Sequence, residues 1–293
     1  MNKKIVIGFF ALLATTVLLA SCGNGTKDVV KTEGSSEAAQ TEEDIIRKDV
    51  ETLLDSVLTS SDKGFSRLYG ESYDRWTEKN IFPEQIEGAI KDNDWTPESK
   101  YTYQYAKDFD KLTPSDVLER FLKTRRDNLK DIKEYDIKDI DVADDKATVT
   151  FMSRQINNTA SANAVNNIYL ALADGNLDVF GALNQANAAD SEFKKLHTLV
   201  SYFLYYANFS NLLVSYSDIP SRLNETPLTE GTYEITFDLE KDSEGHWVIS
   251  EQNYKNLISD LLNYDEPASQ FVYPDGTHAK AGSTETSSST NVG

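Results

Sequence analysis

The sequence predicts an α+β fold in which helices pack on an antiparallel sheet. Several segments repeat apolar residues at helical spacing, and two others alternate apolar and polar residues around charged turns. A chain of 293 residues, 39% of them hydrophobic, is long enough to bury a sizeable core. Helices followed by a hairpin occur twice, over residues 41–155 and 156–264. The sequence is therefore compatible with either one large domain or two tandem halves.

The first 21 residues are typical of an export signal. Lys3 and Lys4 precede an uncharged apolar run over residues 5–20. As a helix this run would be about 24 Å long, shorter than the roughly 30 Å of bilayer hydrocarbon. A basic start, a short apolar run and small residues at its end predict a cleaved signal peptide rather than a permanent membrane span.

The only cysteine of the chain, Cys22, follows this run directly, in the stretch Leu19-Ala20-Ser21-Cys22. These four residues resemble the lipobox of bacterial lipoproteins. The resemblance implies a diacylglyceryl group on the Cys22 thiol, cleavage between Ser21 and Cys22, and a lipid-anchored position on the extracytoplasmic face of the cell membrane, for which we expect a Gram-positive host. Two acyl chains hold a protein durably at a membrane, whereas one binds only marginally.

Two flanking segments are expected to be disordered, because they are poor in large apolar residues and rich in Gly, Ser and Thr. Residues 22–40 would form a tether with a reach on the order of 25 Å. Residues 265–293 would form a tail.

The chain is strongly acidic. It has 29 basic and 48 acidic residues, a net charge of −19, which becomes −21 when Lys3 and Lys4 leave with the signal. Phosphate binding requires clustered Lys and Arg, so this balance argues against nucleic acid as a partner. It also opposes electrostatic adhesion to anionic lipid, which leaves Cys22 as the expected means of membrane attachment.

Helices are predicted in both halves of the chain. Thr41 and Asp44 form a capping pattern at the start of a helix whose apolar stripe continues to Leu58, and Thr113 with Pro114 begins a second helix. In the second half, a helix is expected to end at Gly175, and a long one to begin near Asp190. A closing helix is expected to carry the apolar residues Tyr254, Leu257, Ile258, Leu261 and Leu262.

Two hairpins are predicted from alternating residues. The first turns at Asp144-Asp145 and places Ala147, Val149 and Phe151 on one face. The second has the sequence GTYEITFDLEKDSEGHWVIS, which resembles the last strands of cystatin-like and nuclear-transport-factor-2-like α+β domains. That resemblance implies a curved sheet wrapped on helices and no particular activity.

No pattern of catalytic or metal-binding residues stands out. His197, His246 and His278 lack a second ligand at metal-site spacing, and the acidic segment 139–145 lacks the glycine and terminal Glu of a calcium loop. No Gly-x-Ser-x-Gly or phosphate-binding loop occurs. We therefore expect no metal, no cofactor and no enzymatic activity.

Tyrosines are the candidate binding residues. Tyr101, Tyr103 and Tyr105 are predicted to share one face of a strand, and together with Trp247 they form the expected binding surface. A further aromatic row on the long helix consists of Tyr202, Tyr205, Tyr206 and Phe209. Core packing is the alternative role for all of them.

The sequence thus predicts a lipoprotein with a non-enzymatic binding or structural role at the cell envelope, whose partner is an unidentified protein, peptide or glycan. Two alternatives stay open. A solute-binding lipoprotein of a transporter would have two lobes with parallel strands. An envelope hydrolase would have a pocket with convergent carboxylates.

Overall fold

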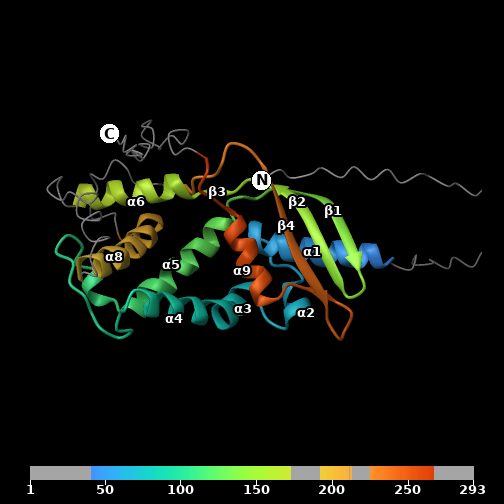
Figure 1. Cartoon of the computed structure of the whole chain (residues 1–293), viewed down its shortest axis with the longest axis horizontal. Coiled ribbons are helices and arrows are strands. Elements are labelled where there is room, and N and C mark those ends of the chain that lie inside the picture. Colours follow the sequence, from blue (N-terminus) through green and yellow to red (C-terminus); the bar gives the residue numbers. More distant parts are fainter. Residues whose placement is uncertain (1–40, 173–191, 211, 213–224, 267–293) are drawn as a thin grey trace, which may run out of the picture. The chain divides into compact units, whose positions relative to one another are not determined.

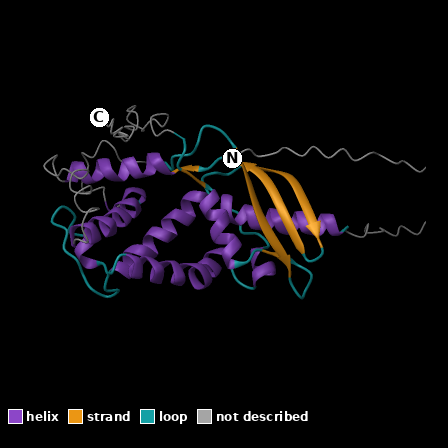
Figure 2. Ribbon diagram, viewed as in Figure 1, coloured by secondary structure: helices purple, strands orange, loops and turns teal. Residues whose placement is uncertain are grey.

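The computed structural model describes residues 41–172, 192–210, 212 and 225–266. They combine helices with an antiparallel sheet (Figure 1 and Figure 2), which confirms the predicted α+β fold class. The expected signal, lipobox and tether lie outside the described residues, as do positions 267–293 of the expected tail.

The main sheet has four strands in the order β1-β2-β4-β5, and all neighbours are antiparallel. The strands are β1 (Tyr135–Ala143), β2 (Lys146–Ser153), β4 (Tyr233–Lys241) and β5 (Trp247–Val248). Both predicted hairpins are confirmed. Because β2 pairs with β4, the two hairpins belong to one sheet. A separate parallel pair joins β3 (Ile156–Asn157) to β6 (Leu262–Asn263).

The alternation of the strands gives the sheet a buried and a solvated face. Val149 lies opposite Phe237, and both are buried, whereas their neighbours Thr148 and Asp238 are exposed and hydrogen-bond to each other. Asp144 begins the first turn with a φ of 55°, a left-handed conformation that Asp tolerates better than most residues.

Two helices cover the buried face of the sheet. α1 (Glu42–Leu58) contacts β1 and β5, and α9 (Glu251–Asp260) contacts β4. The predicted capping box at the start of α1 is confirmed: the hydroxyl of Thr41 accepts the Asp44 N–H at 3.2 Å, and the Asp44 carboxylate accepts the Thr41 N–H at 3.1 Å.

A helical stretch leads from α1 towards the second part of the core. It comprises α2 (Phe65–Tyr69), α3 (Tyr73–Trp76), the π-helical turn η1 (Thr77–Ile81) and α4 (Phe82–Asp92). The Phe82 N–H donates to the carbonyl of Thr77, five residues back. This wider turn directly precedes Pro83, which has no N–H to donate.

The remaining helices form a second buried cluster. They are the 3-10 turn η2 (Phe109–Lys111), α5 (Pro114–Leu129), α6 (Asn158–Leu172) and α8 (Glu192–Phe209), and α8 packs on both α5 and α6. This cluster combines positions 95–121 with 165–207, whereas the sheet cluster combines 46–156 with 235–261. Each part of the core therefore draws on both halves of the sequence. Gly175, the expected end of α6, lies outside the described residues.

Candidate functional site

Helix α5 carries two adjacent arginines whose surroundings differ. The helix begins at the capping box of Thr113 and Asp116, and it buries Phe121 in the second cluster and Leu129 in the sheet cluster. Consecutive residues of an α-helix point about 100° apart. Arg125 and Arg126 therefore face different parts of the molecule.

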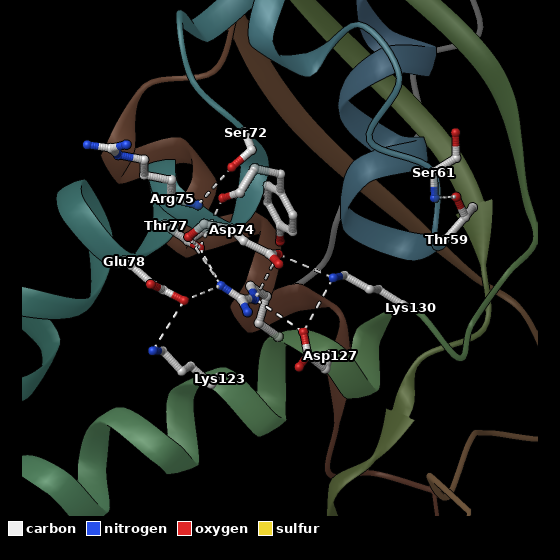
Figure 3. A network of polar contacts seen from close by, with 12 residues as sticks. Thr59, Ser61, Ser72, Asp74, Arg75, Thr77, Glu78, Lys123, Asp127 and Lys130 are labelled. Carbon is white, nitrogen blue, oxygen red and sulfur yellow. Dashed lines mark hydrogen bonds and ion pairs between the residues drawn. The ribbon is translucent and has the colours of Figure 1, made fainter.

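Arg126 is held in a network of polar contacts, and its partners Asp74, Glu78 and Asp127 are labelled in Figure 3. Its side chain is 7% exposed and forms ion pairs with Asp74 at 3.3 Å, Glu78 at 3.2 Å and Asp127 at 3.3 Å. It also donates to the hydroxyl of Thr77 at 3.1 Å. Burial alone would lower the pKa of the guanidinium, but the carboxylates, led by Asp127, raise it above its usual value. This arginine joins α5 to α3 and η1.

Arg125 has no such partners. It is half-buried, and its guanidinium carbon lies 5.6 Å from the centre of the Phe121 ring. Within the described residues it forms no ion pair with a carboxylate and no hydrogen bond. Its N–H donors therefore have no acceptor among the residues that the structure describes, although the chain contains many more acids than bases.

A hollow of about 320 Å³ lies beside Arg125, between α5, α6 and α8, and we call it the Arg125 cleft. The residues that give it its chemical character are Arg125, Asn158, Asn166, His197, Tyr202 and Tyr205. The lining formed by the described residues contains amides, hydroxyls, aromatic rings and one guanidinium, and it contains no carboxylate.

A second hollow, of about 260 Å³, also includes Arg125 in its wall. It is formed by η1, α4, α5, α9 and the segment after α9, and it includes Lys255 and the exposed Tyr264. Lys255 is paired with Glu84. Arg125 is the unpaired cation that the two hollows share.

His197 lies in the wall of the Arg125 cleft. It is 5% exposed, and its ring stacks on that of Tyr169 with 4.8 Å between the ring centres. Its Nε2 atom is buried and has no hydrogen-bond partner among the described residues. Burial lowers the pKa of His197 to about 4, so the imidazole is neutral at neutral pH.

Aromatic rings form the floor of the cleft. Phe121 lies edge-on to Tyr202 at 4.6 Å and to Tyr205 at 5.1 Å. Burial raises the pKa of both tyrosines, and the positive charge of Arg125 opposes part of that shift. The Tyr205 hydroxyl accepts a hydrogen bond from the Asn128 amide at 2.9 Å. These phenols are neutral, so Arg125 has no anionic partner here.

The predicted strand through Tyr101, Tyr103 and Tyr105 is wrong, because residues 101–105 form a loop that ends in a turn. The Tyr103 N–H donates to the side chain of Asp110 at 2.9 Å rather than to a neighbouring strand. Tyr103 is buried, and Tyr101 and Tyr105 are half-buried against the same cluster. Tyr103 and Tyr105 border a separate hollow.

Trp247 lies elsewhere in the molecule. It is 1% exposed, in the sheet cluster, so the structure does not bring it together with the three tyrosines. The row on the long helix was predicted correctly as helical, and Tyr202 and Tyr205 of that row line the Arg125 cleft. Arg125 is not among the binding residues predicted from the sequence, where its signal is its place in a basic pair on an amphipathic helix.

Cys22 and Ser21 lie outside the described residues, as does His278. None of the helices in the part of the chain described by the structure is both long and apolar enough to cross a bilayer. Across the same residues, His, Cys, Asp and Glu side chains form no group of three or more that could hold a metal ion.

No family model and no curated protein matches this chain. Among solved structures, it is similar to the crystal structure of ycdA, a candidate lipoprotein of Bacillus subtilis, with 10% identity and a TM-score of 0.44 over 74% of this chain. The chain spans 56% of the length of that protein. A similarity of this size assigns neither a fold family nor a function.

Proposed function

We propose that this protein is a lipoprotein anchored by acylated Cys22 on the extracytoplasmic face of the cell membrane, and that its folded part has a non-enzymatic binding role. The lipobox-like stretch Leu19-Ala20-Ser21-Cys22, directly after an apolar export signal, supports the anchor. The first described helix is α1, so the expected tether lies between the anchor and the cleft in the sequence.

The unpaired guanidinium of Arg125 in the wall of a cleft is the observation that carries the binding role. An ionised side chain that loses part of its hydration without gaining a partner is unfavourable. The neighbouring Arg126 has three carboxylate partners, which come from α3, η1 and α5, whereas the described lining around Arg125 contains no carboxylate. An unfavourable charge in a hollow of ligand size is typical of a binding site.

The two alternatives have less support. A solute-binding lipoprotein would have lobes with parallel strands, whereas the four-stranded sheet here is antiparallel. A glycoside hydrolase would need a pair of carboxylates across its cleft. The described lining of the Arg125 cleft offers donors and aromatic surface instead.

The anchor is tested by Cys22→Ser in the full-length protein, with Ser21→Gly as the matched control. Ser21→Gly keeps a small residue before the cysteine, so it should leave the protein in the membrane fraction after a wash in high salt. Cys22→Ser should remain unacylated. It should then stay unprocessed or be released, and in neither case incorporate labelled fatty acid. A Cys22→Ser protein that incorporates fatty acid like the unaltered protein contradicts the anchor.

A further inference from the structure

We propose that the Arg125 cleft binds a ligand that has one carboxylate and an apolar or aromatic body. This inference rests on the proposed binding role and names the chemical class of the ligand.

The positive charge of Arg125 indicates which anionic group the ligand carries. A guanidinium presents its N–H donors in a planar fork that matches a carboxylate with two parallel hydrogen bonds. Arg125 lacks a carboxylate within the described protein, so a ligand can supply one. The cleft offers a single unpaired positive charge in a strongly acidic chain. A single carboxylate balances that charge, whereas a doubly charged phosphate would leave an excess negative charge.

The Arg125 cleft also contains polar side chains that have no hydrogen-bond partner among the described residues. Asn158 and Asn166 line the cleft from the same side of α6, eight positions apart. Neither amide forms a side-chain hydrogen bond with the described residues. The Nε2 of His197 also has no partner in this part of the chain, but it is buried. The amides of Asn158 and Asn166 are therefore the groups that can bind the polar atoms next to a ligand carboxylate.

The rest of the cleft favours an apolar body. Phe121, Val165 and Tyr202 contribute ring and methyl surface to its wall. Its volume of about 320 Å³ is at the small end of the range for ligand sites, about 300–1,000 Å³. This size fits a small organic acid or the last residue of a peptide. Both present one carboxylate next to a side chain or ring.

The test uses the whole mature chain, residues 22–293 with Cys22→Ser, so that failure of the anchor does not affect it. The probes are two acid–amide pairs: 3-phenylpropionate with 3-phenylpropanamide, and N-acetylphenylalanine with its C-terminal amide. Calorimetry measures the affinity for each probe, and the NMR resonances of the histidine rings report where the probe binds. Each acid should bind about tenfold or more tightly than its amide. The His197 ring resonances should shift, while those of His246 and His278 stay in place.

Variants of α5 supply the matched controls. Arg125→Gln should weaken binding of the acids by about tenfold, and Arg125→Lys, which keeps the charge but loses the fork, should have an intermediate effect. Arg120→Gln removes the same charge from an exposed position of the same helix. It should change the affinity by less than about twofold. Melting curves establish that each variant is folded.

The results distinguish a peptide carboxylate from a free organic acid as the ligand, and they support or overturn the proposal. Tighter binding of N-acetylphenylalanine identifies a peptide carboxylate, and tighter binding of 3-phenylpropionate identifies a free acid; both support the proposal. Equal binding of acids and amides, no binding of any probe at millimolar concentration, equal effects of Arg125→Gln and Arg120→Gln, or tighter binding of inorganic phosphate would overturn it.

Discussion

The carboxylate of Asp49 in α1 accepts a hydrogen bond from the backbone N–H of Trp247 in β5, with 3.0 Å between the heavy atoms. The other oxygen of Asp49, whose side chain is 1% exposed, pairs with Arg67 of α2 at 2.7 Å. One buried acid thus joins the first helix, the second helix and the last strand of the main sheet. Helices α1 and α2 are neighbours in the sequence, whereas Trp247 is 198 positions from Asp49.

Asp49→Ala should lower the free energy of unfolding by about 2–4 kcal/mol, because it leaves a buried N–H and a guanidinium without an acceptor. Urea unfolding measures the change. Glu42→Gln is the control, since it removes an exposed ion pair with Lys241 and should cost less than about 0.5 kcal/mol. Equal effects of the two substitutions would contradict the structural role of Asp49.

The hydroxyls of Tyr73 and Tyr254 form a buried hydrogen bond of 2.6 Å between α3 and α9. Tyr73→Phe and Tyr254→Phe should each cost about 1–2 kcal/mol, because each leaves the other hydroxyl unpaired. The double variant should cost less than the sum of the two by about 1 kcal/mol. Chemical denaturation of all four proteins measures this coupling. Strict additivity would show that the hydroxyls do not interact.

Arg126 and Arg125 should differ sharply in their effect on stability. Arg126→Gln removes the buried partner of three carboxylates and should lower the free energy of unfolding by about 3 kcal/mol. Arg125 forms no ion pair or hydrogen bond with the described residues, so Arg125→Gln removes a cation over the Phe121 ring and should change this free energy by about 0.5 kcal/mol or less. Thermal unfolding measures both. A large loss for Arg125→Gln would assign that residue to structure rather than to binding.

His197 should make stability depend on acid pH. Its pKa is about 4 in the folded protein and about 6.5 in an unfolded chain, so the unfolded state takes up the proton first as the pH falls. The stabilisation is complete above about pH 6.5 and is lost towards about pH 4, by on the order of 3 kcal/mol.

His197→Phe keeps a ring against Tyr169 but does not titrate, so stability should fall less steeply over this range in the variant. Urea unfolding at several pH values compares the two proteins, and carboxylates that titrate in the same window affect both alike. An unchanged slope would place the His197 pKa at its ordinary value.

Local signals made much of the fold predictable. The capping pairs at Thr41 and Thr113 involve residues three positions apart, so both helix starts can be read from the sequence. The hairpins follow from alternation over eight or nine residues. The strand predicted from the three alternating tyrosines at 101–105 is wrong because so short a run is weak evidence of a strand. The Tyr103 N–H, which a strand would donate to its neighbour, donates instead to the carboxylate of Asp110.

The candidate site depends on contacts over long sequence distances. Arg126 is paired because Asp74 and Glu78, about 50 positions earlier, lie beside it. Arg125 is unpaired because α6 and α8 present neutral side chains to it. No periodicity in the sequence distinguishes these neighbouring arginines. The same holds for the joining of the two hairpins, which depends on the pairing of β2 with β4.

The mass of the mature protein purified from membranes tests the proposed anchor at Cys22. We expect an N-terminal peptide that begins at Cys22 and carries a diacylglyceryl group on the thiol, with the loss of residues 1–21. A mature chain that begins at another residue, or a Cys22 peptide without lipid, would contradict it.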